Sequence, residues 1–358
     1  MRYVSMTSHN IGMNLATEQY LMNDKDFGRE PLVLFYYEDP CIIVGRNQNT
    51  LEEINQDYVK EHNIRVTRRL SGGGAVYQDL GNLCFSFVVP SDSEEFGDFK
   101  SFTQPIVDVL HKMGATTAEV SGRNDILVDG KKFSGNAMYS RNGKTFSHGT
   151  LMLNVDLSVV ADALHVAKDK IASKGIKSVR SRVTNLRPFL DKEYQDIDVP
   201  TFRDDLIKGL FHVDSLDEIK DKQYVVTPED QKEIDKIYEQ YYNNWDWVYG
   251  KSPEFTIKRR KHFDMGTIDA RFDVKDGVIK NVKFYGDFFG PQDINELAAK
   301  LQGVKYDHDA IAKVLNENGT QQYITGIPTD QIADLLAWLS FTVIFSKMWL
   351  IDHFRMVD

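Results

Sequence analysis

The spacing of apolar and polar residues predicts short strands alternating with amphipathic helices. Apolar residues recur at helical intervals over Asn10–Met22 and over Phe99–Met113, so each segment is expected to form a helix with one buried face. Runs of β-branched and apolar residues predict strands at Leu32–Tyr37 and Cys41–Gly45. A Thr-x-x-Glu spacing that opens Thr50–Glu61 predicts a single capped helix over that segment. Strands and helices in this order favour an α+β fold.

Two tight-turn signals define the middle of the chain. Asp129-Gly130 and Asn142-Gly143 are the residue pairs that two-residue hairpin turns favour. They predict a three-stranded meander whose strands are Asp125–Val128, Lys131–Tyr139 and Thr145–Val155.

A glycine-rich stretch interrupts the strands before this meander. Arg68–Val89 is predicted to form a strand, a glycine turn at Ser71–Gly74, a second strand, a tight turn and a third strand. Consecutive glycines leave backbone N–H groups uncovered, and Arg68 and Arg69 add positive charge beside them. The first hypothesis is an anion-binding turn, and the alternative is a hairpin whose glycines serve only the turn geometry.

The last third of the chain predicts a second, smaller α+β domain. Thr227-Pro228 is expected to open a helix, and the break at Tyr249–Pro253 marks a boundary. The predicted domains are residues 1–248, a linker at 249–253, and residues 254–358 with a C-terminal helical tail. Beyond the break, the expected strands and helices are Phe255–Lys261, Ile268–Val274, Val278–Tyr285, Asp293–Leu301 and Ala310–Asn316.

The apolar segment near the C-terminus is too short to span a membrane. Leu335–Phe345 holds eleven residues, against about 20 for a transmembrane helix, so a buried terminal helix is expected. Cys41 and Cys84 give no disulfide framework, and the N-terminal residues contain no apolar signal core. These features predict a cytoplasmic protein that has no membrane partner.

The chain as a whole is acidic, but it contains one strongly basic segment. The net charge of −10 over 358 residues argues against general nucleic-acid binding, which needs a basic face. Lys168–Arg182 nevertheless holds six lysines and arginines against Asp169 alone. The composition predicts a mobile loop, with a solvated basic face as the equal alternative.

Several common site motifs are absent from the sequence. Tyr77 stands where a dinucleotide fingerprint needs its third glycine, and Asn136-Ala137 replaces the Lys-Ser/Thr of a P-loop. No two histidines are four residues apart, and neither Cys-x-x-Cys nor Gly-x-Ser-x-Gly occurs.

Four segments, in this order along the chain, together resemble the lipoate–protein ligase family. They are Arg68–Val76, Asp129–Ala137, His148–Leu151 and Ser178–Leu186, and the resemblance extends over roughly residues 1–335. It implies a mixed β-sheet catalytic domain of the biotin/lipoate ligase type with a small α+β C-terminal accessory domain. It also implies an ATP-dependent, two-step reaction. Lipoate or octanoate reacts with ATP to give an acyl-adenylate, and a lysine of an acceptor domain then displaces AMP.

The resemblance carries specific roles over to residues of this chain. Lys132 corresponds to the catalytic lysine, whose cation would lower the repulsion between carboxylate and α-phosphate. Asn124-Asp125, just before the lysine hairpin, is a candidate Mg²⁺ site with Asp125 as the ligand, and a simple turn is the alternative. The basic run corresponds to the adenylate-binding loop. The positions implied to bind ATP or the adenylate are Arg69, Ser71, Gly73, Gly74, Ala75, Val76, Tyr77, Asn82, Lys132, Ala137, His148, Thr150 and Arg180.

The implied ligands include an apolar substrate and protein acceptors. Lipoate needs a hydrophobic slot, for which Tyr36, Leu70 and the Leu83–Val89 strand are candidates. The implied acceptors are lipoyl domains of 2-oxoacid dehydrogenase E2 subunits and the glycine-cleavage H protein. Two features depart from the family: Gln78 stands where relatives often have histidine, and the tail Phe341–Asp358 matches nothing in it.

Three other functions remain as alternatives. An ATP-independent octanoyl or lipoyl transferase would need a cysteine nucleophile near the lysine, whereas Cys41 and Cys84 lie well upstream. A biotin ligase is disfavoured by the Arg-Arg-x-Ser-Gly-Gly-Gly form of the glycine turn. A non-catalytic lipoate-binding protein is disfavoured by the presence of Lys132.

Overall fold

The computed structural model describes most of the chain, which divides into two compact units, Met1–Lys251 and Ser252–Asp358. The described residues are 1–23, 25–92, 97–122, 124–164, 183–249, 257–275 and 277–337. The predicted basic loop Lys168–Arg182, with Arg180, and the tail Phe341–Asp358 lie outside these residues. Each unit has its own secondary structure and its own core.

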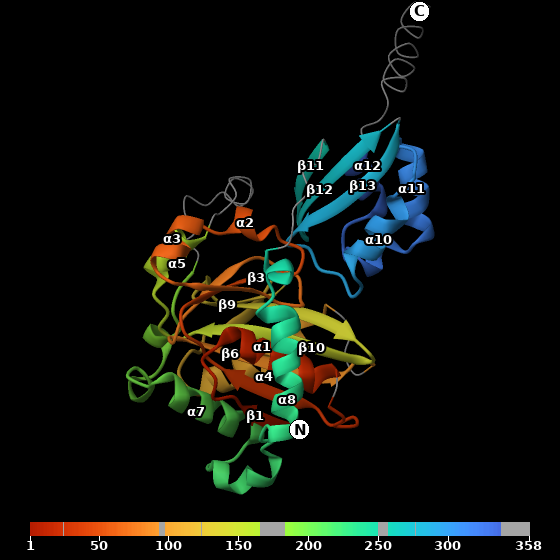
Figure 1. Ribbon diagram of the computed structural model, residues 1–358. Helices are drawn as coiled ribbons and strands as arrows, with labels where there is room; N and C mark the ends of the chain where they lie inside the picture. The colour runs from red at the N-terminus through yellow and green to blue at the C-terminus, as the bar shows by residue number, and fades with distance from the viewer. Residues whose placement is uncertain are drawn as a thin grey trace, which may run out of the picture. The chain divides into compact units, whose positions relative to one another are not determined.

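A mixed seven-stranded sheet forms the centre of the first unit (Figure 1). β1 (Arg2–Ser5) runs parallel to β2 (Leu32–Tyr36), and all other neighbouring strands of this sheet are antiparallel. From β2 the order continues through β6 (Asn82–Pro90), β10 (Lys144–Met152), β9 (Lys131–Arg141), β8 (Asp125–Val128) and β7 (Glu119–Ser121).

The predicted meander of β8, β9 and β10 is confirmed. Its two turns have positive φ at both central residues: 47° and 71° at Asp129 and Gly130, and 52° and 73° at Asn142 and Gly143. Two-residue hairpins need this conformation, which asparagine, aspartate and glycine adopt most readily. The first of these turns leads directly into the segment that contains Lys132.

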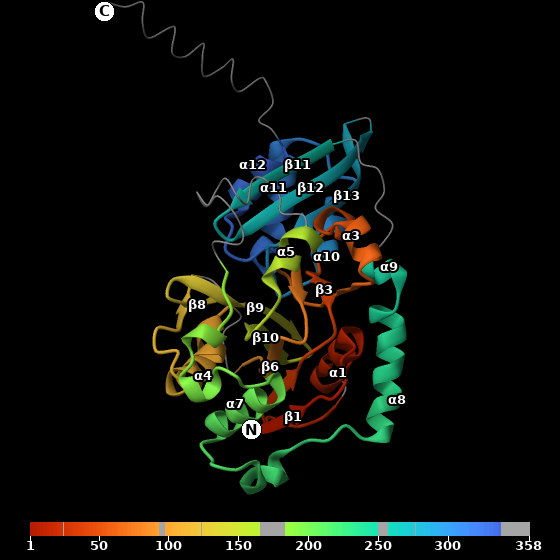
Figure 2. The ribbon, with the colours of Figure 1, turned by 90° about the vertical axis from the view of Figure 1, so that its left-hand side faces the viewer.

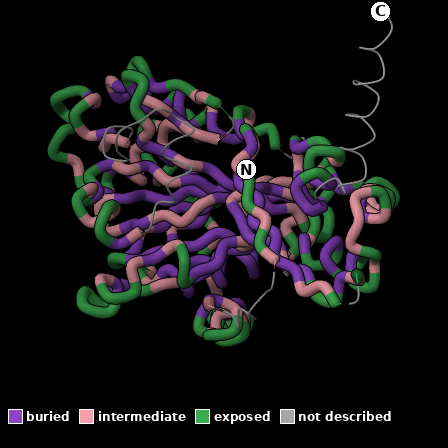
Figure 3. The backbone as a smooth tube through the Cα atoms, turned by 90° about the horizontal axis from the view of Figure 1, so that it is seen from above, coloured by how far each residue is buried: buried purple, intermediate pink, exposed green. Residues whose placement is uncertain are grey.

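Helices cover both faces of the large sheet (Figure 2). On one face α1 (Ile11–Asn23) packs with α8 (Pro228–Ile237), in a core that includes Cys84 and Val88 of β6. On the other, α4 (Phe99–Lys112) and α7 (Val199–Phe211) pack against each other and contact β9 and β6. Every residue of β2 and most of β6 are buried, and Figure 3 shows long buried stretches of the backbone in the interior.

A second, three-stranded sheet carries the glycine turn. β3 (Cys41–Val44) lies in the middle, parallel to β4 (Arg65–Arg68) and antiparallel to β5 (Val76–Gln78). Because β3 separates β4 from β5, the glycine segment crosses over β3 and is not a hairpin turn. The hairpin alternative from the sequence is therefore wrong.

The prediction of one helix from Thr50 to Glu61 is also wrong. The segment forms α2 (Thr50–Glu53) and α3 (Gln56–Glu61), separated at Ile54, which makes an isolated β-bridge to Leu164. Asn49, not Thr50, is the N-cap residue, and the Thr50 hydroxyl donates to the carbonyl of Val248. The Thr-x-x-Glu spacing thus forms no capping box, because the threonine bonds to a distant segment.

The second unit has a three-stranded antiparallel sheet of β11 (Ile257–Phe263), β12 (Gly266–Lys275) and β13 (Val278–Gly286). Its core joins this sheet to α10 (Ile294–Leu301), α11 (His308–Glu317) and α12 (Thr329–Leu336). The predicted strands and the first two helices are confirmed. Of the predicted helix Leu335–Phe345, only the first residues are described, at the end of α12.

Short helical segments complete the first unit and one loop of the second. They are α5 (Leu157–Ala163), α9 (Trp245–Val248), a π-helical turn at Tyr238–Tyr242, and 3₁₀ turns at Arg187–Phe189, Lys192–Tyr194, Leu216–Lys222 and Thr320–Gln322. Among the residues that the structure describes, no helix has the length and apolarity to cross a membrane.

Candidate active site

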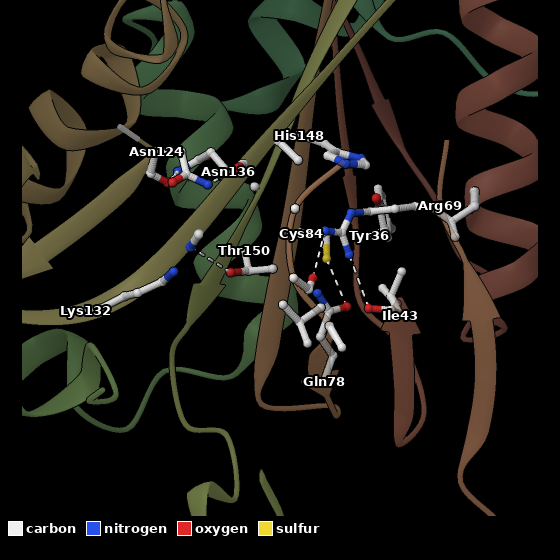
Figure 4. A pocket seen from close by; sticks show the side chains of 18 residues that line it. Tyr36, Ile43, Arg69, Gln78, Cys84, Asn124, Lys132, Asn136, His148 and Thr150 are labelled. Carbon is white, nitrogen blue, oxygen red and sulfur yellow. Dashed lines mark hydrogen bonds between the residues drawn. The ribbon is translucent and has the colours of Figure 1, made fainter. Parts of the chain in front are cut away.

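A pocket in the first unit lies where the two sheets and α1 meet (Figure 4). Most of the residues that the sequence nominated lie around it: Arg69, Gly73, Gly74, Ala75, Val76, Lys132, Ala137, His148 and Thr150. Nine more residues complete the described lining: Leu15, Tyr36, Ile43, Gln78, Cys84, Asn124, Gly135, Asn136 and Gly149. In Figure 4, Lys132 and Thr150 lie on one side and Arg69, Cys84 and Gln78 on the other.

The charge of the pocket favours an anion. Arg69 and Lys132 line it, and no aspartate or glutamate is among the described lining residues. Gly73 and Gly74 of the glycine turn also line it, and backbone N–H groups carry a partial positive charge. The arrangement therefore fits a negatively charged ligand without a competing carboxylate in the lining.

Lys132 enters the pocket from the start of β9, just after the tight turn at Asp129-Gly130. Its Nζ is 2.6 Å from Oδ1 of Asp125 on β8, and 28% of its side chain is exposed. A Cβ on Gly135 would lie 3.0 Å from Nζ, so a side chain at this position would crowd the lysine. The absence of a side chain at position 135 leaves the amine room to reach a ligand.

The glycine turn is held by Arg69 from within. Its Nη2 donates to the carbonyls of Gly72 (2.7 Å) and Gly74 (2.8 Å), Nε donates to Oγ of Ser71 (3.1 Å), and Nη1 donates to the carbonyl of Ile43 (3.2 Å). Burial lowers the pKa of Arg69 to about 10, which keeps the guanidinium charged at neutral pH. Arg69 thus both shapes the turn and brings a cation to the pocket.

Arg68 does not face the pocket, contrary to the expectation that both arginines supply charge there. Its guanidinium donates to backbone carbonyls of the loop after β3 and of α9, and to the hydroxyl of Thr50. The acceptors are Gly45, Arg46, Gln48, Trp247 and Val248, together with Thr50. Arg68 is therefore a structural residue that ties α9 to the end of β4.

Three buried polar side chains form a hydrogen-bonded row next to the pocket, and of these His148 belongs to the pocket lining. Oγ of Ser71 is 2.7 Å from Nε2 of His148, and Nδ1 of His148 is 3.1 and 3.2 Å from the two carboxyl oxygens of Glu18. The sequence nominated Ser71 and His148 but missed Glu18. A signal existed, because Glu18 shares the apolar face of α1 with Leu15 and Met22 and is 2% exposed.

Several nominated residues lie away from the pocket lining. Tyr77 packs in a separate core cluster with Ile42, although its backbone follows the glycine turn. Asn82 is fully buried and donates to Sγ of Cys84, and Ser71 lies in the row behind the wall. Leu70 packs with α1 instead of lining the pocket.

Asn124 and Asn136 form a hydrogen-bonded polar corner of the pocket; the sequence nominated Asn124, with Asp125, for Mg²⁺ but did not assign Asn136 to binding. The N–H of Asn136 donates to the carbonyl of Asn124 (2.9 Å), and Nδ2 of Asn124 donates to the carbonyl of Asn136 (2.6 Å). A Cβ on Gly149 would lie only 2.0 Å from Oδ1 of Asn136. Glycine at position 149 therefore leaves room for the Asn136 amide beside β10.

The two cysteines are buried thiols. Burial and the nearby Glu38 raise the pKa of Cys84, and burial likewise raises that of Cys41. Burial raises the pKa of Glu38 itself to about 8. Cys84 lines the pocket, but neither cysteine is in a setting that stabilises a thiolate.

A preformed metal centre is absent from the described part of the chain, where no three histidine, cysteine, aspartate or glutamate residues cluster. Asp125 is the nearest carboxyl to Lys132 and is already bonded to its Nζ. A Mg²⁺ ion at Asp125 would have to take its other ligands from a phosphate-bearing substrate and water, as Mg²⁺ commonly does.

The fold and the pocket define an α+β protein with an anion site built from a lysine and a glycine turn. Residues 10–211 match the family model for the lipoyl protein ligase A/B catalytic domain, and residues 252–336 match that for the bacterial lipoate protein ligase C-terminus. The chain is 45% identical over 324 residues to lipoate-protein ligase LplJ of Bacillus subtilis (strain 168), covering 90% of this chain and 96% of the relative. The chain belongs to the lipoate–protein ligase family.

Solved structures agree with this membership. P. falciparum LipL1 in complex with lipoate has a TM-score of 0.71 at 27% identity, covering 88% of this chain and 94% of that one. A bipartite lipoate protein ligase from Thermoplasma acidophilum, studied with its E2 lipoyl domain, has a TM-score of 0.60 at 28% identity, covering 72% and 98%. Lipoate-protein ligase A bound with ATP has a TM-score of 0.57 at 27% identity, covering 70% and 98%.

Proposed function

We propose that this enzyme attaches lipoate or octanoate to a lysine of lipoyl acceptor domains through an acyl-adenylate made from ATP. The observation that carries the proposal is Lys132, which faces a glycine turn across a pocket without a lining carboxyl group. The reported complexes of relatives with lipoate and with ATP support the choice of substrates.

In the first step the carboxylate of lipoate attacks the α-phosphorus of ATP, and the bond to pyrophosphate breaks. Two anions must approach each other, so a cation between them lowers the barrier. Nζ of Lys132 is suited to this task, provided that it exchanges Asp125 for the reacting oxygens. An ion pair with 28% of the lysine side chain exposed can make this exchange.

The glycine turn would hold the nucleotide. The backbone from Gly73 to Val76, which lines the pocket, would offer N–H donors to phosphate and adenine, and Arg69 keeps the turn in shape. Tyr77 is assigned to the nucleotide by family resemblance alone. Ala137 and Thr150 would complete the nucleotide side, because both line the pocket next to Lys132. His148 would act from the pocket lining, and Asn82 and Ser71 from behind it. Arg180 of the basic run is assigned by family resemblance alone.

Mg²⁺ would enter with ATP. When bound, it neutralises charge on the phosphates, and Asp125 is the carboxyl that would hold it. The rest of its coordination would come from phosphate oxygens and water.

Lipoate's hydrocarbon tail requires the apolar part of the pocket. Leu15, Tyr36, Ile43 and Cys84 supply it, and all four belong to the buried core around α1.

In the second step, the amine of the acceptor lysine attacks the acyl carbon and AMP leaves. The acceptors are lipoyl domains of 2-oxoacid dehydrogenase E2 subunits and the glycine-cleavage H protein. A relative studied with its E2 lipoyl domain supports this class of acceptor.

The transferase alternative needs a thiolate to accept the acyl group. Cys84 is placed in the pocket wall, but burial raises its pKa and favours the inert thiol. A non-catalytic lipoate carrier would not need Lys132 beside the glycine turn. Both alternative functions are therefore less well supported than the ligase function.

We assign catalysis to residues 1–248 and an accessory role to residues 254–358, joined by the linker 249–253. We also assign the enzyme to the cytoplasm, where ATP and apo acceptor domains are present and where two buried thiols stay reduced.

The decisive experiment measures pyrophosphate release from Mg-ATP with lipoate, without and with an apo lipoyl domain. The ligase releases pyrophosphate only when both substrates are present, and it releases AMP in the same step that modifies the acceptor. A second arm offers octanoyl thioester without ATP. Acceptor modification in that arm alone would establish the transferase instead.

A further inference from the structure

Strands β9 and β10 separate at the pocket. Their backbones are paired as far as Asn136 and Gly149. Beyond this pair, the N–H of Gly135 donates to Oγ1 of Thr150 (3.2 Å), a side-chain bond in place of a backbone pair. All four of these residues line the pocket, together with Lys132 near the start of β9. The pocket therefore opens where the two strands part.

A β-bulge brings the side chain of Lys132 to this opening. The register between β8 and β9 shifts just after Lys132, and Phe133 is the extra residue on β9. In a regular strand, residues three positions apart point to opposite faces. The bulge removes this alternation, so Lys132 shares a face with Gly135, and a Cβ on Gly135 would lie 3.0 Å from Nζ.

Residues 183–187, which we call the spacer segment, connect the separated strands. The first of them makes a parallel β-bridge to Lys132, and the N–H of Thr184 donates to the Lys132 carbonyl (2.9 Å). The N–H of Leu186 donates to the carbonyl of Met152 (2.7 Å), the last residue of β10. Because β8 occupies the other edge of β9, the spacer segment lies along the edge that faces β10.

Asn185 fastens the spacer segment to the chain that follows β10. Its Oδ1 accepts from the N–H of Val155 (3.0 Å), and its Nδ2 donates to the carbonyl of the same residue (2.9 Å). The side-chain amide thus satisfies both backbone groups of Val155, as a neighbouring strand would. Leu186, the next residue, is fully buried. The spacer segment is therefore fixed on the β10 side of the gap as well as at Lys132.

We propose that Asn185 is a positioning residue that keeps the spacer segment between β9 and β10 and, through the N–H of Thr184, fixes the backbone of Lys132. The inference rests on the proposed function, because it takes Lys132 as the catalytic cation. A lysine whose backbone is already fixed loses less freedom when Nζ moves from Asp125 to the reacting oxygens. Asn185 is not among the described residues that line the pocket, so its effect passes through Lys132.

The first test measures hydrogen exchange at the amide of Thr184 by NMR. Asn185→Ala removes both bonds to Val155 and should speed this exchange by about tenfold, because the amide is protected only while the spacer segment stays in place. Asn154→Ala is the matched control, since it changes an exposed neighbour of Val155, and it should keep the wild-type rate of exchange. Wild-type protection of Thr184 in a folded Asn185→Ala variant overturns the positioning role.

The second test follows the kinetics of pyrophosphate release. Asn185→Ala should lower kcat by about tenfold and change the KM values for ATP and lipoate by less than about threefold, because Lys132 acts in the transition state. The double variant Lys132→Ala/Asn185→Ala should be no slower than Lys132→Ala, since Asn185 acts through the lysine. A residue that only stabilised the fold would slow the double variant further.

The outcomes separate this inference from the proposed function. A wild-type kcat in folded Asn185→Ala, or additive losses in the double variant, overturns the positioning role. Should Asn185→Ala fail to fold, Asn185→Asp decides, because it keeps the acceptor for the Val155 N–H and loses the donor. Unchanged exchange and unchanged kcat in that variant overturn the role. Failure of the wild-type enzyme to release pyrophosphate overturns the ligase assignment, while the exchange measurement still judges the spacer segment.

Discussion

Lys131 and Lys132 are neighbours with different surroundings, which gives a matched pair for mutation. Lys132→Ala should reduce pyrophosphate release by about thirtyfold to several thousandfold, because losing a charged partner costs about 2–5 kcal/mol. Lys131 is exposed beside it, and Lys131→Ala should remain within a few-fold of the wild type. Equal activity of the two variants, with circular dichroism showing both folded, would remove Lys132 from the mechanism.

Cys41 and Cys84 should react slowly with alkylating reagents in the native enzyme. Burial raises both thiol pKa values, so the reactive thiolate is scarce at neutral pH. Mass spectrometry after iodoacetamide treatment at pH 7 should find both cysteines largely unmodified, and both modified after unfolding in urea. Rapid native labelling of Cys84, accompanied by loss of an ATP-independent acyl transfer, would favour the transferase alternative.

Glu38 should make the enzyme less stable as the pH rises. Burial raises its pKa from 4.5 to about 8, so between these values the folded state keeps a proton that the unfolded chain releases. The free energy of unfolding therefore falls from about pH 5 toward pH 8. Glu38→Gln cannot ionise and should lessen this decline by up to about 1.4 kcal/mol per pH unit. Parallel pH profiles from urea unfolding of the two proteins would contradict the buried-acid assignment.

At the scale of elements, the crossing of the glycine turn over β3 depends on close backbone approach. A Cβ on Gly45, just after β3, would lie 2.0 Å from the carbonyl oxygen of Gly73, whereas one on Gly74 would meet nothing within 4 Å. Gly45→Ala should lower the free energy of unfolding by about 1–3 kcal/mol, the usual cost of overpacking. Gly74→Ala should change it much less, although it alters the pocket wall. Thermal melts that rank the two variants in the opposite order would show that the crossing tolerates a side chain.

The same crossing explains why two adjacent arginines have different roles. β4 ends at Arg68, whose side chain turns toward α9, while Arg69 turns under the glycine segment. In an extended chain, successive side chains point to opposite sides. Arg68 therefore connects the end of β4 to α9, and Arg69 lines the pocket.

At the scale of the whole molecule, each unit has a core of its own. The core of the second unit is built from its sheet and helices α10, α11 and α12, and the clusters around α1 belong to the first. A fragment ending at Lys251 should therefore fold alone, with a cooperative melt and native-like circular dichroism. A fragment that is unfolded at 25 °C would mean that the first core needs the second unit.

Local signals in the sequence predicted much of this architecture. The turns at Asp129-Gly130 and Asn142-Gly143, the helix over Phe99–Lys112 and the strands of the second unit follow from residue types within a few positions of each other. Local conformational preference decides such elements before distant contacts form. The order of the four motifs was enough to indicate the family and to nominate Lys132 as the catalytic lysine.

The sequence by itself thus determined the local elements and the family motifs, and the tertiary structure decided which side chains meet. Only the folded chain places β3 between β4 and β5, breaks the predicted helix at Ile54, and brings Glu18 to His148, 130 positions away. Contacts between distant segments depend on how the sheets and helices pack, and no local pattern records that packing. The row behind the glycine turn is therefore a property of the fold, built from residues that the sequence leaves far apart.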